Sequence, residues 1–124
     1  NKKVTYWDNV TANSVYKISD ISDEIGYTPA TIKVKCRESG NLIITNQTTN
    51  STTIVNNCSV GETIIIDSDT EIITSSLQTH KLYNDFNFKY FKLINDYDNR
   101  LNKVTFSLNA DVEISYIPLI KNAI

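Results

Sequence analysis

The sequence predicts an all-β fold, an antiparallel β-sandwich in which two sheets each bury one face. Apolar and polar residues alternate along most of the chain, which is the period of a half-buried strand. Roughly eight to ten such segments, short and separated by turn residues, are typical of a sandwich. The remaining faces are rich in Thr, Ser, Asn and Lys, so each strand leaves one apolar face to be covered. The pattern leaves Greek-key and jelly-roll strand order open.

One domain is expected to account for residues 1–124, which is enough chain to bury a core. The net charge of −2 comes from 12 basic and 14 acidic side chains that form no blocks, which argues against a nucleic-acid partner. No apolar run approaches the roughly 20 residues that cross a bilayer, and no secretory signal opens the chain. The chain begins at Asn1 and contains no Met, which indicates processing or a piece of a longer polypeptide.

The N-terminal part contains one ambiguous segment. Residues 5–7 are expected to form a short strand. In 15–27 the apolar residues are spaced three to four positions apart, as in one short helix, and a strand followed by a loop explains the segment nearly as well. The residues concerned are Val15, Ile18, Ile21 and Ile25.

The next segments alternate clearly. In 30–38, the residues Ile32, Val34 and Cys36 share one face. The segments 41–49 and 51–59 are rich in Thr, Ile and Val, which suit a pleated surface, and a turn near Asn50 predicts that they form a hairpin.

Two further pairs of strands are expected. Residues 62–68 and 71–75 are strand-like, with Ser68-Asp69-Thr70 as the turn between them. Later, 102–109 and 111–120 alternate and are predicted to form a second hairpin with its turn at Asn109 and Ala110. Pro118 is expected to end the outer strand, because proline cannot donate to a ladder. The residues that face inward are Val104, Phe106, Leu108, Val112, Ile114 and Tyr116.

An aromatic-rich stretch covers 82–95. Phe86, Phe88 and Tyr90 alternate, and then Phe91 and Leu93 continue with the opposite parity. Such a change indicates a bulge or a bend.

The stretch Ile64 to Thr70, "IIIDSDT", has the Asp-x-Asp-x-Thr pattern of haloacid-dehalogenase-type phosphotransferases. That chemistry requires a buried parallel strand that leads into a helix, whereas another strand-like run follows here. Asp67, Asp69 and Glu71 also resemble alternating calcium ligands, yet Ile72 occupies the position where an EF-hand needs glycine. A solvated acidic turn, with Asp side chains capping backbone N–H groups, is the preferred interpretation.

His80 and the two cysteines give no catalytic or metal signature. His80, the single histidine, lies in a polar stretch and is expected to be solvated, with no nucleophile motif near it. Cys36 and Cys58 lack metal-ligand spacing, so we expect no zinc site and no cofactor. Buried free thiols are preferred, with a disulfide as the alternative.

Four aromatic residues raise the question of sugar binding. Rings on β-sandwich modules can stack on sugars, and core or rim packing is the more ordinary role, which we prefer. The candidates are Trp7, Tyr83, Tyr90 and Tyr97.

The order of turns and strands resembles the C-terminal domain of the distal tail proteins of long-tailed phages, the "phage tail component" family. The matching elements span about three quarters of the chain, and their order carries the resemblance because each alone is only a strand and a turn. They are "GYTPATIKV" (26–34), "ITNQTT" (44–49), "GETIIID" (61–67), "FKLINDYDNRLNKVTF" (91–106) and "VEISYIP" (112–118).

The resemblance implies a non-enzymatic structural protein of the virion tail tip, made in the cytoplasm of a bacterial host. Relatives look like ring-forming hubs between tail tube and tip, with an outward C-terminal sandwich similar to lectin and carbohydrate modules that docks other tail-tip or baseplate proteins. The chain is then the C-terminal part of a longer tail protein, and this domain alone is expected to be monomeric. The alternative is a carbohydrate-binding module of a surface or secreted protein, with Trp7 and Tyr97 as the sugar-binding residues and a glycan as the partner.

Overall fold

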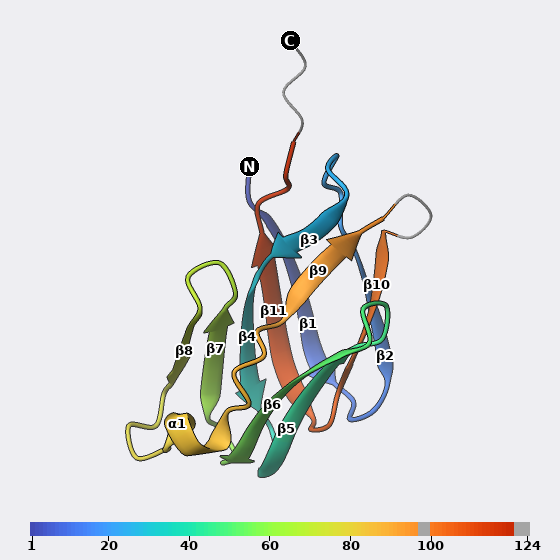
Figure 1. Ribbon diagram of the computed structural model, residues 1–124. Helices are drawn as coiled ribbons and strands as arrows, with labels where there is room; N and C mark the ends of the chain where they lie inside the picture. The colour runs from blue at the N-terminus through green and yellow to red at the C-terminus, as the bar shows by residue number, and fades with distance from the viewer. Residues whose placement is uncertain (97–99, 121–124) are drawn as a thin grey trace.

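The computed structural model describes residues 1–96 and 100–120, which form two antiparallel sheets packed face to face and a small third sheet (Figure 1). The larger sheet has the strand order β1 (Lys3–Val10), β11 (Ala110–Tyr116), β4 (Thr31–Cys36), β7 (Thr63–Asp67) and β8 (Ile72–Ser75). The second sheet has the order β2 (Val15–Ser19), β10 (Leu101–Phe106), β5 (Gly40–Asn46) and β6 (Ser51–Cys58). The third sheet pairs β3 (Gly26–Pro29) with β9 (Lys92–Asn95), and α1 covers Leu82–Asp85. The predicted all-β antiparallel sandwich is confirmed.

The strand order is that of a jelly roll. Eight strands pair in a nested series, β1 with β11, β2 with β10, β4 with β7 and β5 with β6. This long ribbon is rolled up, so that β11 also pairs with β4 and β10 with β5. Of the two orders that the sequence left open, the structure therefore has the jelly roll, in which two Greek keys form two sheets.

The predicted hairpin of 102–109 and 111–120 is wrong. Its two strands, β10 and β11, lie in different sheets, and the chain crosses from one sheet to the other between them. The Ser107 N–H donates to the Ile43 carbonyl on one sheet, whereas the Asn109 carbonyl accepts from the Arg37 N–H beside the other. Leu108, between these contacts, is buried. Alternation requires only that both strands present an apolar face to the same core, and a sheet-to-sheet crossover satisfies that as well as a hairpin does.

The core lies between the two large sheets, and the predicted inward faces are confirmed. Most of its side chains are fully buried, and each contributes about 1.5–3 kcal/mol of transfer free energy when it is an Ile, Leu, Val or Phe. The predicted members found there are Ile32, Val34, Cys36, Val104, Phe106, Leu108, Val112, Ile114 and Tyr116.

The ambiguous segment 15–27 is a strand followed by a loop. β2 pairs with β10, and the chain then turns through a loop in which the buried Asp20 carboxylate accepts hydrogen bonds from the Ser22 N–H at 3.0 Å and the Thr28 hydroxyl at 2.5 Å. Ile21 and Ile25 are exposed. The strand expected at 5–7 belongs to the longer β1.

Two of the predicted hairpins are confirmed. β5 pairs with β6 across the turn that ends at Asn50, a residue with φ of 55°. β7 pairs with β8, and the Asp69 N–H donates to the Asp67 carboxylate at 2.9 Å. The "IIIDSDT" stretch is thus a strand that leads into a capped acidic turn, as expected.

The parity change in the aromatic stretch coincides with a bend. Phe88 has φ of 59°, an uncommon conformation for a bulky residue, and its side chain is exposed while Phe86 and Phe91 are buried. α1 and this bend place the segment beside the middle of β6, where Phe86 pairs with Val55. No helix in the described ranges is long and apolar enough to span a membrane.

Candidate functional site

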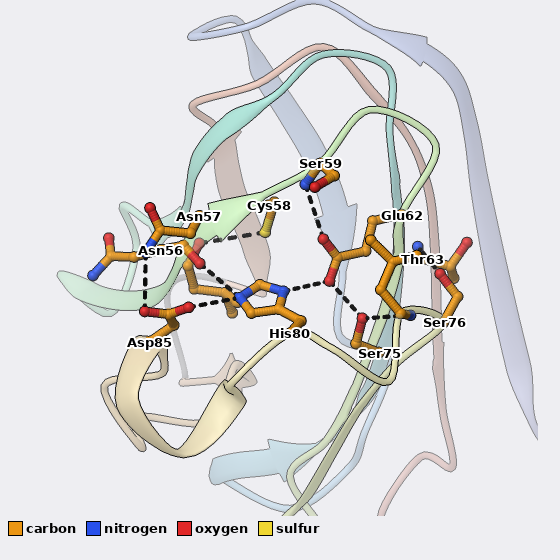
Figure 2. Close-up of polar contacts among 12 residues, drawn as sticks. Asn56, Asn57, Cys58, Ser59, Glu62, Thr63, Ser75, Ser76, His80 and Asp85 are labelled. Atoms are coloured by element: carbon orange, nitrogen blue, oxygen red, sulfur yellow. Dashed lines mark hydrogen bonds and ion pairs between the residues drawn. The ribbon is translucent and has the colours of Figure 1, made fainter.

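A group of polar side chains lies beside α1, where the end of β6 meets the turn before β7 (Figure 2). We call it the His80 cluster, and it consists of Cys58, Glu62, His80 and Asp85. Cys58 ends β6, Glu62 precedes β7, His80 precedes α1 and Asp85 ends α1. Two stretches of the chain, 58–62 and 80–85, thus contribute two side chains each.

The turn before β7 positions Glu62. Gly61 has φ of 84°, a conformation that favours glycine. The Gly61 N–H donates to the Cys36 carbonyl at 2.7 Å, and the Cys36 N–H donates to the Glu62 carbonyl at 2.8 Å. These bonds fix the turn against the end of β4, so the Glu62 side chain points into the molecule and is 1% exposed.

The Glu62 carboxylate accepts hydrogen bonds on both oxygens. Oε1 accepts from the Ser59 N–H at 2.9 Å, and Oε2 accepts from the Ser75 hydroxyl at 2.5 Å and contacts His80 Nδ1. Burial alone would raise the pKa of Glu62, but the hydrogen bonds from Ser75, His80 and Ser59 outweigh it and hold the pKa below its ordinary value. Glu62 is therefore a buried carboxylate in its charged form.

His80 lies between two carboxylates, which corrects the expectation of a solvated side chain. Its side chain is 4% exposed. Nδ1 faces Glu62, while Nε2 contacts the Asn56 carbonyl at 2.8 Å and Asp85 Oδ2 at 2.9 Å (Figure 2). Burial lowers the pKa of His80, but the hydrogen bond and charge of Glu62 raise it above its ordinary value. The polar neighbours of His80 along the chain suggested solvent, whereas its partners lie in other segments.

Cys36 and Cys58 are buried free thiols, as preferred from the sequence. A side-chain hydrogen bond between the two thiols shifts the pKa of each, so the two side chains are close neighbours. That hydrogen bond and burial raise the pKa of Cys58, and its S–H also lies 3.4 Å from the Val55 carbonyl. The Cys58 thiol is therefore protonated and poorly suited to act as a nucleophile.

An open pocket of about 370 Å³ reaches the cluster from solvent. Glu62 and His80 are part of its wall. The other lining residues include Ser59, Leu77, Thr79, Lys81 and Asn84.

The arrangement is suited to holding a positive charge rather than to nucleophilic catalysis. The Ser75 hydroxyl is bound to Glu62, not to His80. Both nitrogens of His80 face oxygen acceptors, so neither ring nitrogen is left to accept a proton from a nucleophile. A proton or a cation between Nδ1 and Glu62 satisfies this geometry.

Sequence reasoning missed Glu62 and Asp85. One signal was present: Ser59 and Glu62 have the Ser-x-x-Glu spacing that allows a carboxylate to reach back to a backbone N–H, and the structure contains that bond. No local pattern indicated that His80, 18 positions later, would meet Glu62.

Residues 1–116 match the protein family described as the phage tail C-terminal domain. The chain belongs to this family. No curated protein and no solved structure gave a match. The family resemblance stated from the motifs is thereby confirmed, and the domain has a structural role in the virion tail, where it interacts with other tail proteins.

Of the candidate sugar-binding aromatics that the structure of this phage tail domain describes, Tyr83 and Tyr90 belong to one aromatic group around Phe86 and Phe88, and Trp7 belongs to another. Trp7 on β1 is partly buried, and its ring packs against Tyr16 and Phe106 with centroid distances of 5.3 and 6.2 Å. Tyr83 is exposed and contacts Phe88 in a different part of the fold. Tyr97 lies outside the described residues. Sugar binding through Trp7 and Tyr97 stays a prediction.

Proposed function

We propose that this phage tail domain is the outward-facing part of a distal tail or baseplate hub at the tail tip, where it docks other tail-tip proteins. The observation that carries the proposal is an exposed apolar surface at the end of the sandwich where Figure 1 places the N-terminus and the end of β11. We call this surface the terminal-end patch, and it consists of Ile21, Ile25, Ile117, Leu119 and Ile120.

Hydrogen bonds hold the two parts of the terminal-end patch together. The N–H groups of Asp23 and Glu24 donate to the Leu119 carbonyl at 2.8 and 3.3 Å, and the Leu119 N–H donates to the Ser22 hydroxyl at 2.9 Å. The loop after β2 and the segment after β11 are therefore one surface. Its side chains are well exposed, with Ile117 at 64% and Ile25 at 56%.

A hollow adjoins this patch. A pocket of about 350 Å³ is lined by Ile117 and Leu119 and also by Lys2, Asp67 and Asp69. The capped acidic turn thus supplies a charged rim beside apolar side chains. An apolar centre with a polar rim is the usual anatomy of a protein interface, and exposed apolar patches mark such sites.

Substitution of the patch tests the docking role. In phage particles whose tail gene encodes this domain, the double substitution Ile25→Asp and Ile117→Asp is expected to abolish incorporation of its docking partner into tail tips, because each change places a charge in an apolar contact. Val60→Asp is the matched control, since Val60 is 65% exposed in the turn before β7, outside the terminal-end patch and its hollow. Negative-stain images and protein composition of purified tails are the measurement.

Normal tails from the double variant, or equal losses in the double variant and the control, would contradict docking through this patch.

We also propose that the full-length parent of this domain forms rings. Its check is whether the purified parent forms rings in electron micrographs. A parent that stays in the cytoplasmic fraction and is absent from tail particles would exclude the tail-tip role.

The contacts of Trp7 do not favour sugar binding as a second function. The Trp7 ring is engaged by Tyr16 and Phe106, which favours the packing role preferred from the sequence. A glycan array with the parent and Trp7→Ala tests the prediction, and silence of the parent on the array would remove it.

A further inference from the structure

We propose that Cys58, Glu62 and His80 form a binding site for a divalent metal ion of borderline softness, with Zn²⁺ as the best match. One ligand atom from each of these residues lies within 4.8 Å of the other two. Tetrahedral zinc places its ligand atoms roughly 3.3–3.8 Å apart. His80 Nδ1 and the Glu62 oxygen are already in direct hydrogen-bond contact, so an ion would have to separate them by about 1 Å. The Cys58 sulfur would have to approach by no more than about 1 Å to complete the set of three ligands. This site is separate from the terminal-end patch and does not depend on it.

The donor set selects the kind of ion. A thiolate, an imidazole nitrogen and a carboxylate oxygen are the three ligand types that Zn²⁺ uses in proteins. Calcium and magnesium require oxygen ligands and do not favour sulfur. The soft sulfur and the hard oxygen together indicate a metal between these extremes.

The hydrogen bonds of His80 resemble those of a metal ligand. Nε2 lies 2.8 Å from the Asn56 carbonyl and 2.9 Å from Asp85 Oδ2, and both oxygens are acceptors. Nε2 therefore carries a proton, and a second proton lies between Nδ1 and Glu62. Loss of that second proton would free the Nδ1 lone pair for an ion. Metal-ligating histidines typically donate their second N–H to a carboxylate or a backbone carbonyl, and His80 does both.

Glu62 is also held in place by outer contacts. The Ser59 N–H and the Ser75 hydroxyl donate to its two oxygens, and Asn57 Nδ2 donates to Asp85 at 3.0 Å. These bonds orient the carboxylate and the residue that supports His80 before any ion arrives. Preorganisation of this kind lowers the cost of binding.

The charge of the buried site is the same with either occupant. Without metal, the Cys58 thiol is neutral, and one proton between His80 and Glu62 balances the carboxylate. A divalent ion would displace two protons, the thiol proton and the shared one, to solvent, and its two charges would balance the Cys58 thiolate and Glu62. Ligand deprotonation of this kind accompanies metal binding generally. Replacement of two protons by one divalent ion leaves the net charge of the buried site unchanged, so the exchange does not require burial of an additional net charge.

The pocket at the cluster supplies an entry path. Glu62 and His80 form part of the wall of the opening of about 370 Å³ described above. An ion can reach them from solvent, and a water molecule can complete a tetrahedral set of ligands.

Cobalt provides a direct test, because Co²⁺ substitutes for Zn²⁺ and its bond to a thiolate gives a near-ultraviolet charge-transfer band. The 124-residue chain, treated with chelator and then dialysed, is expected to bind one Co²⁺ with this band and to release it when Zn²⁺ is added. Cys58→Ser should abolish the band, and His80→Gln should weaken Zn²⁺ binding at least tenfold by calorimetry. Cys36→Ser is the matched control and should retain the band, because Cys36 lies beside Cys58 but outside the group of three.

Far-ultraviolet circular dichroism confirms that each variant is folded. If Cys58→Ser does not fold, protection of the wild-type thiols from an alkylating reagent by Zn²⁺, with loss of that protection in His80→Gln, gives the second readout. Absence of the band in the wild type, or equal Zn²⁺ affinity in wild type and His80→Gln, would show that the cluster holds only a proton and would overturn the proposal. Either outcome leaves docking through the terminal-end patch unaffected.

Discussion

At the scale of single residues, Glu62 is a buried polar side chain whose loss should be costly. It is buried and accepts from Ser59, Ser75 and His80. Glu62→Ala leaves the imidazole and the backbone N–H without their partner. Breaking a buried ion pair typically costs about 3–5 kcal/mol, so we expect a loss of this size in the free energy of unfolding measured with urea.

Glu71 provides the control for that measurement. It is an exposed glutamate in the turn between β7 and β8. Glu71→Ala should change the free energy of unfolding by no more than about 0.5 kcal/mol, as is usual for surface substitutions. Similar losses in the free energy of unfolding for the two variants would mean that the buried contacts of Glu62 do not stabilise the fold more than those of an exposed glutamate.

A second residue-scale prediction concerns acid stability. The Asn9 N–H and the Arg37 guanidinium donate to Asp111, each at 2.9 Å, and together they lower the pKa of Asp111 to about 2. A carboxylate with a depressed pKa stabilises the fold above its unfolded pKa of about 3.9 and loses that contribution as the pH falls toward the folded value. Asp111→Asn should therefore be less stable than the wild type at neutral pH, and the difference should shrink between about pH 4 and pH 2.

Urea midpoints of wild type and Asp111→Asn across this range are the measurement. A difference that stays constant down to pH 2 would contradict the assignment of the depressed pKa to Asp111.

Sequence reasoning located candidate residues better than it located their partners. The free buried thiols and the capped turn at Asp67 follow from local patterns, because a strand position or an Asp-x-Asp spacing is visible within a few residues. The burial of His80 does not follow from a local pattern, because one carboxylate partner lies 18 positions earlier and the other lies on the following helix. A polar sequence environment does not distinguish a solvated histidine from one that is buried with polar partners.

At the scale of elements, the crossing between β10 and β11 restricts the start of β5. Gly40 has φ of 149°, and a Cβ there would lie 3.0 Å from the Leu108 side chain, which is buried in that crossing. Gly26 has φ of 128° and open space around it. Both positions strain an L-residue, but only Gly40→Ala also forces a core side chain to move, so it should be the more destabilising by about 1 kcal/mol or more.

Thermal and urea unfolding of Gly40→Ala and Gly26→Ala compare the two positions directly. If Gly26→Ala were equally or more destabilising, the close approach of Leu108 to β5 would not be a constraint on this element.

The strands were predictable and some of their pairings were not. β5 with β6 and β7 with β8 are joined by short turns, so the neighbour in sequence is the neighbour in space. β10 and β11 are also neighbours in sequence and alternate equally well, yet each pairs with strands from earlier in the chain. The apolar Leu108 in the intervening turn was the available hint, since an exposed hairpin turn rarely places leucine inward.

At the scale of the whole molecule, the sandwich was predictable and the jelly roll was not. Two-layer architecture follows from one apolar face per strand. Strand order depends on which faces and edges meet over the full length of the chain, as when β1 at the start pairs with β11 at the end. Jelly rolls carry many unrelated functions, so the fold alone does not indicate a role in phage tails. The family match over residues 1–116 supplies that role, and the terminal-end patch supplies the surface for a proposed partner.

The central claim is that the domain docks a neighbouring protein at the tail tip through the terminal-end patch. Cryo-electron microscopy of intact tails that contain the full-length parent is its most direct test. We expect density for this jelly roll at the tip, with Ile25, Ile117 and Leu119 against another tail protein. Density for the domain elsewhere along the tail, or at the tip with the patch open to solvent and a different face in contact, would contradict the account.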